Sequence, residues 1–128
     1  QMWYGLYDKE RSYAEDTGIS SAVKSSMIWG SQYDAMLNWV LQGSYKDKVT
    51  HSSTKHGPEP TASEPTEVIN NIFDLGNNLY EWTLEANSTK YRINRGGNYE
   101  DSSSPDGRAR YSSNYDGSDN TSRLTLIL

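Results

Sequence analysis

The chain has 128 residues, a formal net charge of -5 and no cysteine. The length fits a single domain, and the lack of cysteine excludes disulfides, thiolate zinc sites and thiol nucleophiles. The excess of 17 acidic over 12 basic residues argues against a nucleic-acid-binding surface, and no apolar run approaches the roughly 20 residues that cross a bilayer. We expect residues 1–128 to form one domain, the C-terminal part of a longer protein.

The first predicted element covers residues 2–16. Trp3, Leu6 and Tyr7 recur there at near-helical spacing, which predicts a short helix or helical turn, although Gly5 lies inside the pattern. Residues 17–18, Thr-Gly, are expected to end it.

A clearer helix is predicted over residues 31–42. Its apolar stripe follows the spacing i, i+3, i+4 and i+7 and consists of Tyr33, Met36, Leu37 and Val40. We expect Ser31 to cap its start, Asp34 to act as the acid of a capping box, and Gly43 to end the helix.

Residues 43–67 are polar and contain three prolines and two glycines, which predicts a long surface loop without regular structure. The only two histidines, His51 and His56, lie in this stretch. With no third ligand nearby they make a poor metal site, so we expect a solvated loop.

Strands are predicted for the rest of the chain. The apolar stretch 68–86 is broken by a turn at 76–78, and short strands are expected at 91–94 and 108–112. Residues 122–128 alternate, with Leu124, Leu126 and Leu128 on one face, which predicts a final strand with that face buried. One clear helix, several short strands and much irregular structure indicate the α+β class.

The segment 98–121 has an unusual composition, because 19 of its 24 residues are Asn, Asp, Ser, Thr, Tyr or Gly. Such a mixture occurs in disordered segments and in ordinary loops. It is also typical of antibody paratopes, where Tyr supplies stiff contact area and Ser, Asn and Gly supply adaptable hydrogen bonding. Because predicted strands flank the segment, we favour a binding surface.

Several motifs resemble the formylglycine-generating, sulfatase-modifying family. Residues 71–82 (NIFDLGNNLYEW) resemble its N-(I/L)-Y-D-(M/L)-x-G-N-V-W-E-W signature, and residues 95–99 (RGGNY) resemble its R-G-G-S-(Y/W) motif. Ala109-Arg110 followed by residues 122–124 (SRL) resembles its closing A-R…G-F-R-(L/V). Residues 27–36 (MIWGSQYDAM) resemble the W-G-x-Q-W-D-x-M helix of members from phages and gut bacteria. Two departures are Asn77-Asn78 in place of Gly-Asn, and Thr121-Ser122 in place of Gly-Phe.

The resemblance implies a C-type-lectin-like fold with short twisted antiparallel strands. It does not imply the family's oxidase, which needs active-site cysteines that this chain lacks. The variable proteins of diversity-generating retroelements fit better, because they use this fold to display a hypervariable C-terminal region. The implied function is a non-enzymatic, receptor-binding display domain. Its ligand-binding residues would be Asn98, Tyr99, Glu100, Asp101, Arg108, Arg110, Tyr111, Ser113, Asn114, Tyr115, Asp116, Asp119 and Asn120. Arg110 could equally brace the scaffold.

The implied partners are a cell-surface protein or glycan receptor and the rest of a larger tail or surface protein, with no nucleic acid and no membrane insertion. The implied location is the virion, as part of a phage tail, or the cell surface and extracellular space. No cofactor is expected, although Glu81 and Asn77 could contribute to a structural calcium site of the kind some relatives bind.

Two other functions stay open. One is a calcium-dependent lectin of fixed carbohydrate specificity, although residues 59–61 and 64–66 (both EPT) lack the Asn of the usual sugar-binding E-P-N motif. The other is an enzyme that uses a carboxylate pair drawn from Glu67, Asp74, Glu81 and Glu85.

Overall fold

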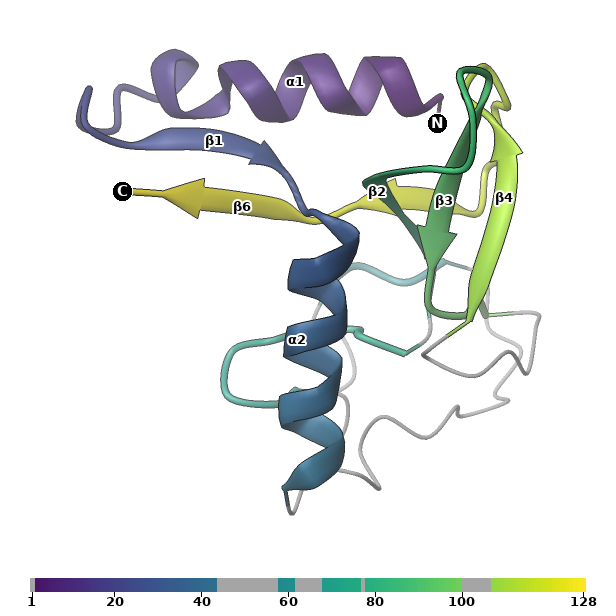
Figure 1. Ribbon diagram of the computed structural model, residues 1–128. Coiled ribbons are helices and arrows are strands. Elements are labelled where there is room, and N and C mark those ends of the chain that lie inside the picture. The colour runs from purple at the N-terminus through teal and green to yellow at the C-terminus, as the bar shows by residue number, and fades with distance from the viewer. Residues whose placement is uncertain (1, 44–57, 62–67, 77, 100–106) are drawn as a thin grey trace.

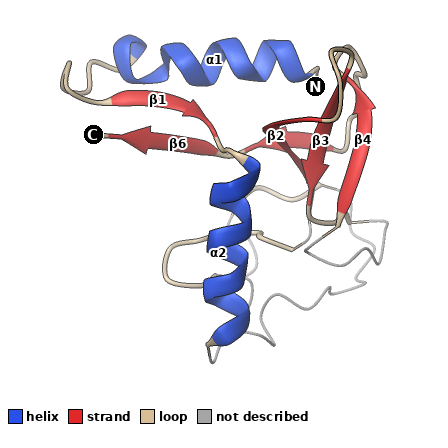
Figure 2. Ribbon diagram, viewed as in Figure 1, coloured by secondary structure: helices blue, strands red, loops and turns tan. Residues whose placement is uncertain are grey.

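The computed structural model describes residues 2–43, 58–61, 68–76, 78–99 and 107–128. These residues form helices and strands together, so the predicted α+β class is confirmed (Figures 1 and 2). In chain order the elements are α1 (Trp3–Asp16), β1 (Lys24–Met27), α2 (Gly30–Gln42), β2 (Tyr80–Ala86), β3 (Tyr91–Arg95), β4 (Arg108–Ser112), β5 (Asn120–Ser122) and β6 (Leu124–Ile127). Most of the predicted 43–67 loop, with both histidines, lies outside the described residues, as do Glu100 and Asp101.

The strands form two sheets. One has the order β4-β3-β2-β5, and the other is a ribbon in which β1 pairs antiparallel with β6. β5 pairs parallel with β2, which corrects the expectation of antiparallel strands alone. Figure 1 shows α1 lying along β1, while α2 begins just beyond the end of β1 and runs away from the β1–β6 ribbon.

α1 is a 14-residue helix, so the helix predicted within residues 2–16 is confirmed, and the fold has a second helix beside the one clear helix that was expected. Packing explains the difference. Trp3 is buried against Met27 and Trp82, and its indole Nε1 donates to the Thr83 carbonyl at 2.8 Å. Gly5 lies on the exposed side, where its lack of a side chain costs no contact. As predicted, α1 ends at Asp16, before Thr17 and Gly18.

α2 confirms the predicted stripe, because Tyr33, Leu37 and Val40 are all buried. Its start was predicted wrongly. The helix begins at Gly30, and the Gln32 Oε1 accepts a hydrogen bond from the Trp29 backbone N–H at 2.9 Å. Gln32 therefore takes the reciprocal place in the capping box.

Ser31 therefore lies inside the first turn of α2 and is not its cap. Asp34 is not the capping acid, because its carboxylate pairs with arginines of the larger sheet. The predicted end is confirmed, since Gly43 follows the last helical residue.

The turn region between α2 and β2 supplies the other half of the core under α2. Ile69 and Leu75 are buried there against the helix. The backbone is left-handed at Asn70, Asn71, Asp74 and Asn78, with φ between 46° and 67°. Asn and Asp tolerate this conformation better than other residues with a Cβ, so these four positions can form sharp turns without glycine.

The final strand exists as predicted, but its leucine face is not buried. Leu126 is 51% exposed and Leu128 is fully exposed. β6 pairs with β1 alone among the described elements, and α1 packs mainly on β1, so the outer part of the ribbon stays uncovered. No helix within the described residues is long and apolar enough to cross a membrane.

Candidate ligand-binding surface

β4 lies at one edge of the larger sheet and carries the centre of the predicted contact region. Its partner is β3, with Ile93 opposite Arg110 and Asn94 opposite Ala109. Successive side chains of a strand point to opposite faces. Tyr111 therefore packs toward Trp82 and α1, whereas Arg108 and Arg110 lie on the other face.

An aromatic series connects the core to the surface at the end of β4. The Trp82 and Tyr111 rings meet edge to face with centroids 6.3 Å apart, and Tyr111 stacks on Tyr115 at 4.8 Å. The Tyr115 backbone N–H donates to the Ser112 carbonyl at 2.8 Å. Tyr115, which is 40% exposed, is thus held on a buried aromatic base.

A polar network lies beneath the turn that follows β4. The Asp119 carboxylate accepts from the Asn120 side chain at 3.0 Å and from the Asn98 side chain at 3.3 Å. The Asn94 Nδ2 donates to the Asn120 Oδ1 at 3.0 Å. Both Asn98 and Asn120 are buried, so this network fixes the turn from the inside.

Gly117 tightens the same turn. A Cβ at this position would lie 2.5 Å from the Asp119 Oδ1 and 2.6 Å from the Tyr115 ring. Only glycine fits here without displacing a neighbouring side chain. Ser113 is buried at the other side of the turn, and its N–H donates to the Lys90 carbonyl at 3.0 Å.

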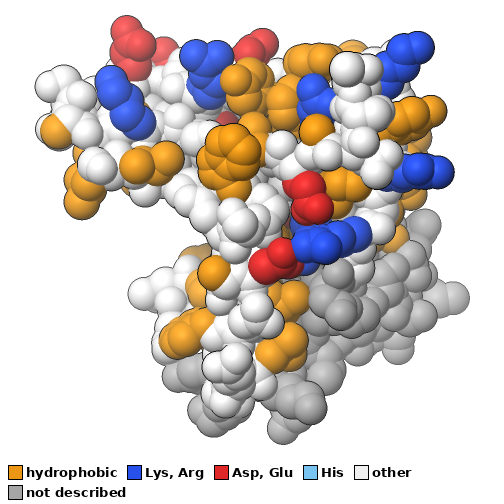
Figure 3. Space-filling view, in the orientation of Figure 1, with side chains coloured by type: hydrophobic (Ala, Val, Ile, Leu, Met, Phe, Trp, Pro, Cys, Tyr) orange, Lys and Arg blue, Asp and Glu red, His pale blue; other side chains and the backbone are white. Residues whose placement is uncertain are grey.

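Arginines and carboxylates alternate where β4 faces α2. The Asp34 carboxylate pairs with Arg95 on one oxygen and with Arg108 at 2.6 Å on the other. Glu85 adds contacts of 3.5 Å to Arg95 and 3.7 Å to Arg108. Figure 3 shows acidic side chains on both sides of a basic one in this part of the molecule.

The inner arginine of this network is a scaffold residue. Arg95 is 1% exposed, and its guanidinium lies 4.8 Å from the Tyr33 ring centroid. Glu85 approaches α2 closely enough that a Cβ on Gly30 would lie 2.5 Å from its Oε2. Arg108, in contrast, is half-exposed and lies at the solvent side of the network.

A second ion pair lies under the C-terminal strands. Arg123 donates to both oxygens of Glu81, with its Nε 3.0 Å from the Oε2, and its Nη2 donates to the Phe73 carbonyl at 2.9 Å. Burial raises the pKa of the Glu81 carboxyl, and the Arg123 guanidinium opposes that rise. A groove of about 230 Å³ beside the pair is lined by Asp74, Asn78 and Ser122 among others.

This pairing bears on the two carboxylate hypotheses. Both Glu81 oxygens are occupied by Arg123, so a calcium ion or a substrate there would have to displace the guanidinium. Among the described residues no group of three or more His, Asp or Glu side chains is placed to hold a metal ion. Glu67 and Asn77 lie outside the part of the chain that the structure describes.

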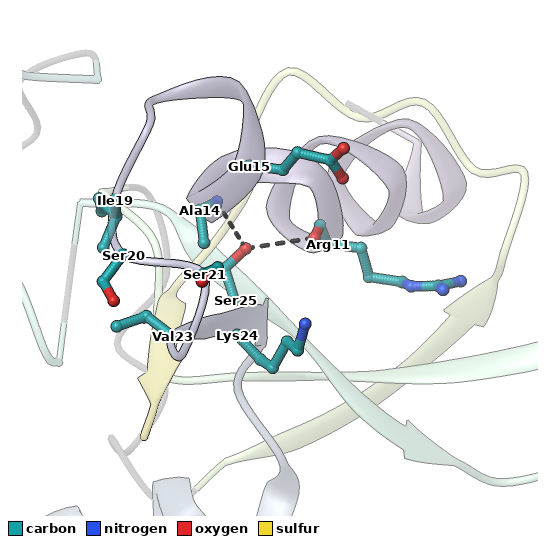
Figure 4. A pocket seen from close by; sticks show the side chains of 9 residues that line it. All are labelled: Arg11, Ala14, Glu15, Ile19, Ser20, Ser21, Val23, Lys24 and Ser25. Atoms are coloured by element: carbon teal, nitrogen blue, oxygen red, sulfur yellow. Dashed lines mark hydrogen bonds between the residues drawn. The ribbon is translucent and has the colours of Figure 1, made fainter.

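A separate hollow of about 640 Å³ lies between the end of α1 and β1 (Figure 4). The Ser25 hydroxyl accepts from the Ala14 N–H at 2.9 Å and donates to the Arg11 carbonyl at 3.2 Å. In the close-up the Arg11 side chain points away from Ile19 and Ser20. The Ser25 hydroxyl therefore joins α1 to β1, and none of the predicted contact residues lines this hollow.

The described contact residues separate into three groups by burial. Asn98, Ser113 and Asn120 are buried, which corrects their expected role as surface contacts. Tyr99, Tyr111 and Asp119 are partly buried. The exposed members, which we call the display surface, are Arg108, Arg110, Asn114, Tyr115 and Asp116.

Sequence reasoning missed the residues that support this surface from other elements. Asp34 was assigned to a helix cap, and Glu85 was considered only as a catalytic carboxylate. Gly117 had no signal beyond its place in a turn-rich segment. Comparisons with protein-family models, curated proteins and solved structures found no match for this chain.

Proposed function

We propose that this chain is a non-enzymatic ligand-binding domain that presents the display surface to a receptor. The observation that carries the proposal is the contrast within residues 107–122. The five side chains of the display surface are exposed there on a strand and turn whose inward side is held by Tyr111, Asn120 and Gly117. A surface of this kind can exchange side chains without loss of the scaffold.

The finer form of the proposal is a C-type-lectin-like variable protein of a diversity-generating retroelement. It is supported by the motif resemblance and by the Tyr, Ser, Asn and Asp content of residues 98–121. The partner would then be a cell-surface protein or glycan, and the domain would belong to a phage tail or another surface protein.

The non-enzymatic character is supported by the engagement of the candidate carboxylates. Glu81 is paired with Arg123, and Glu85 lies against Arg95 and Arg108. The Asn78 side chain donates to Asp74 at 3.4 Å. Each of these three carboxylates therefore has a cationic or amide partner.

Sequencing the gene from many members of one population tests the proposal. We expect substitutions to concentrate at the codons for Arg108, Arg110, Asn114, Tyr115 and Asp116. The codons for Trp82, Ser113 and Asn120 should stay constant and serve as the internal control. Invariance of the exposed codons beside an active reverse transcriptase gene would contradict a variable protein.

The competing lectin reading has its own discriminating measurement. A glycan array probed with and without a calcium chelator should give no chelator-sensitive binding if the display surface acts alone. Binding that disappears with the chelator and with Glu81→Gln would favour the calcium-dependent lectin instead.

A further inference from the structure

Among the described strands, β4 lies at one edge of the larger sheet. Within the described residues it pairs with β3 and with no other strand. An edge strand presents a row of unpaired backbone N–H and C=O groups. An extended segment of another protein can add to such an edge as a further strand, with its backbone bonds giving affinity and its side chains giving specificity.

The two strands at this edge are basic, although the whole chain has a net charge of -5. Residues 90–95 and 107–112 hold five Lys and Arg residues and no acid. Asp34 and Glu85 neutralise Arg95 and Arg108 from neighbouring elements. Lys90, Arg92 and Arg110 form no ion pair with any described carboxylate. Arg92 lies over the Trp3 ring on the face of the sheet that carries Tyr111, so Arg110 is the cation left without an ion pair on the face of Arg108. Figure 3 shows basic side chains along the side of the molecule where β4 lies.

We propose that the open edge of β4 binds an extended, acidic segment of a partner protein. The proposal rests on the display function and names the ligand class that this particular sequence recognises. The Arg110 guanidinium is the main charged contact, because it is exposed and already on the sheet face. Arg108, two residues earlier, lies on the same face at the solvent side of its ion pairs.

The geometry also specifies the pattern of the ligand. Residues two apart on a strand lie about 7 Å from each other on one face. Acidic side chains at alternate positions of the added strand would therefore face Arg108 and Arg110 in turn. Tyr115, beyond the end of β4, stacks on Tyr111 on the opposite face, so its exposed ring is open to a side chain of the added strand that points to that face.

A simpler reading is that the two arginines only discourage aggregation, since charged residues commonly protect open edges. That reading needs no ligand. A diffuse positive patch is a third reading, and it would bind any polyanion without regard to backbone pairing. The protective reading predicts no peptide binding, and the diffuse-patch reading predicts binding that does not depend on the peptide backbone. Strand addition predicts binding that does depend on it.

The test uses the whole chain labelled with ¹⁵N and a short peptide of alternating Glu and Thr. We expect the backbone amide signals of residues 108–112 to shift on titration. A matched peptide with Gln in place of Glu should bind about tenfold more weakly. The same Glu peptide with alternate backbone nitrogens methylated should lose binding, because it cannot pair along an edge.

The protein variants separate the site from overall charge. Arg110→Gln should weaken binding about five- to tenfold, whereas Lys24→Gln, which removes the same charge from β1, should leave it unchanged. Equal binding by the methylated peptide or by a sulfated oligosaccharide would overturn the proposal, and so would equal effects of the two variants or no binding at all. Population variation at the display codons would stand in any of these outcomes, so failure here is distinguishable from failure of the display function.

Discussion

The inward and outward sides of residues 107–122 differ in nearly every physical respect. Inward side chains such as Tyr111 and Asn120 have defined aromatic or hydrogen-bond partners from β2 and β3. On the outward side Arg110 has no ion pair within the described residues, and Asn114 accepts a hydrogen bond from the neighbouring Ser112 hydroxyl. The difference shows that a polar, low-complexity composition can hide a division between scaffold and contact surface.

The division also changes which residues count as functional candidates. Asn94, Asn98, Asp119 and Asn120 bind one another and so belong to the scaffold. A polar side chain in this segment is a contact candidate only if it is not part of that network. Four substitutions probe the contrast, and they are ordered from the largest expected effect to the smallest.

Trp82→Ala should destabilise the protein most, by about 3–5 kcal/mol, because it empties a fully buried site shared by Trp3 and Met27. It also removes the ring on which Tyr111 rests. Urea unfolding followed by circular dichroism measures the loss. Trp39→Ala, at a half-exposed position of α2, is the matched control and should cost much less. Similar losses for the two variants would argue against a core centred on Trp82.

Gly117→Ala should cost about 1–3 kcal/mol, because the added methyl group overlaps Asp119, Asn120 and Tyr115. Gly5→Ala is the opposite control. No atom lies within 4 Å of a Cβ there, and the substitution in α1 should stabilise the protein by about 0.5–1 kcal/mol. Thermal unfolding of both variants gives the comparison, and a neutral Gly117→Ala would mean that the turn is loosely packed.

Tyr115→Ala should lower stability by only about 0.5–1 kcal/mol, the contribution of one exposed stacked pair. Tyr111→Ala should cost more, since its ring also contacts Trp82. Chemical denaturation gives the free energy of unfolding of both variants, and the difference shows which tyrosine belongs to the scaffold. A loss from Tyr115→Ala as large as that from Trp82→Ala would place Tyr115 in the core and undermine the display function.

Glu10→Gln probes the far end of the segment, where the Ser122 hydroxyl donates to the Glu10 Oε1 at 2.6 Å. Burial raises the pKa of Glu10, the hydrogen bond from Ser122 opposes the rise, and Glu81 adds to it. The folded state therefore holds this proton more tightly than the unfolded state does, and stability is lost as the pH rises from about 4.5 through the folded pKa.

The Glu10→Gln variant should lack that loss, so its stability relative to the natural chain should increase between pH 4 and pH 8. Melting temperatures across this range measure the effect. Glu15→Gln, at an exposed position of α1, should show no such trend. A flat difference for Glu10→Gln would mean that the carboxyl is well solvated.

Elements with a strong periodic signal were predictable from the sequence. The Tyr33, Leu37 and Val40 stripe of α2 needed only local spacing, and the strands at 91–94 and 108–112 were found from short runs between turn residues. β1 was missed because Lys24–Met27 has two serines and no β-branched residue. Its pairing with β6, about one hundred residues away, supplies what local propensity lacks.

The candidate surface was predictable in outline and not in detail. Composition located the segment, but burial of Asn98, Ser113 and Asn120 depends on partners from β3 and from turns that no local pattern specifies. The role of Asp34 depends on α2 lying beside β3 and β4, which is a tertiary arrangement. That Arg110 has no ion pair among the described residues can be seen only in the structure, where the carboxylates nearby pair with Arg95 and Arg108.

The pairing of residues 24–27 with residues 124–127 has a consequence for biosynthesis. β6 is synthesised about one hundred residues after β1, so an emerging chain carries an unpaired β1 strand until β6 has left the ribosome. Contacts between such distant residues also slow closure of the fold. We therefore expect a nascent chain of this protein to expose unpaired backbone for longer than a helical bundle of equal length would.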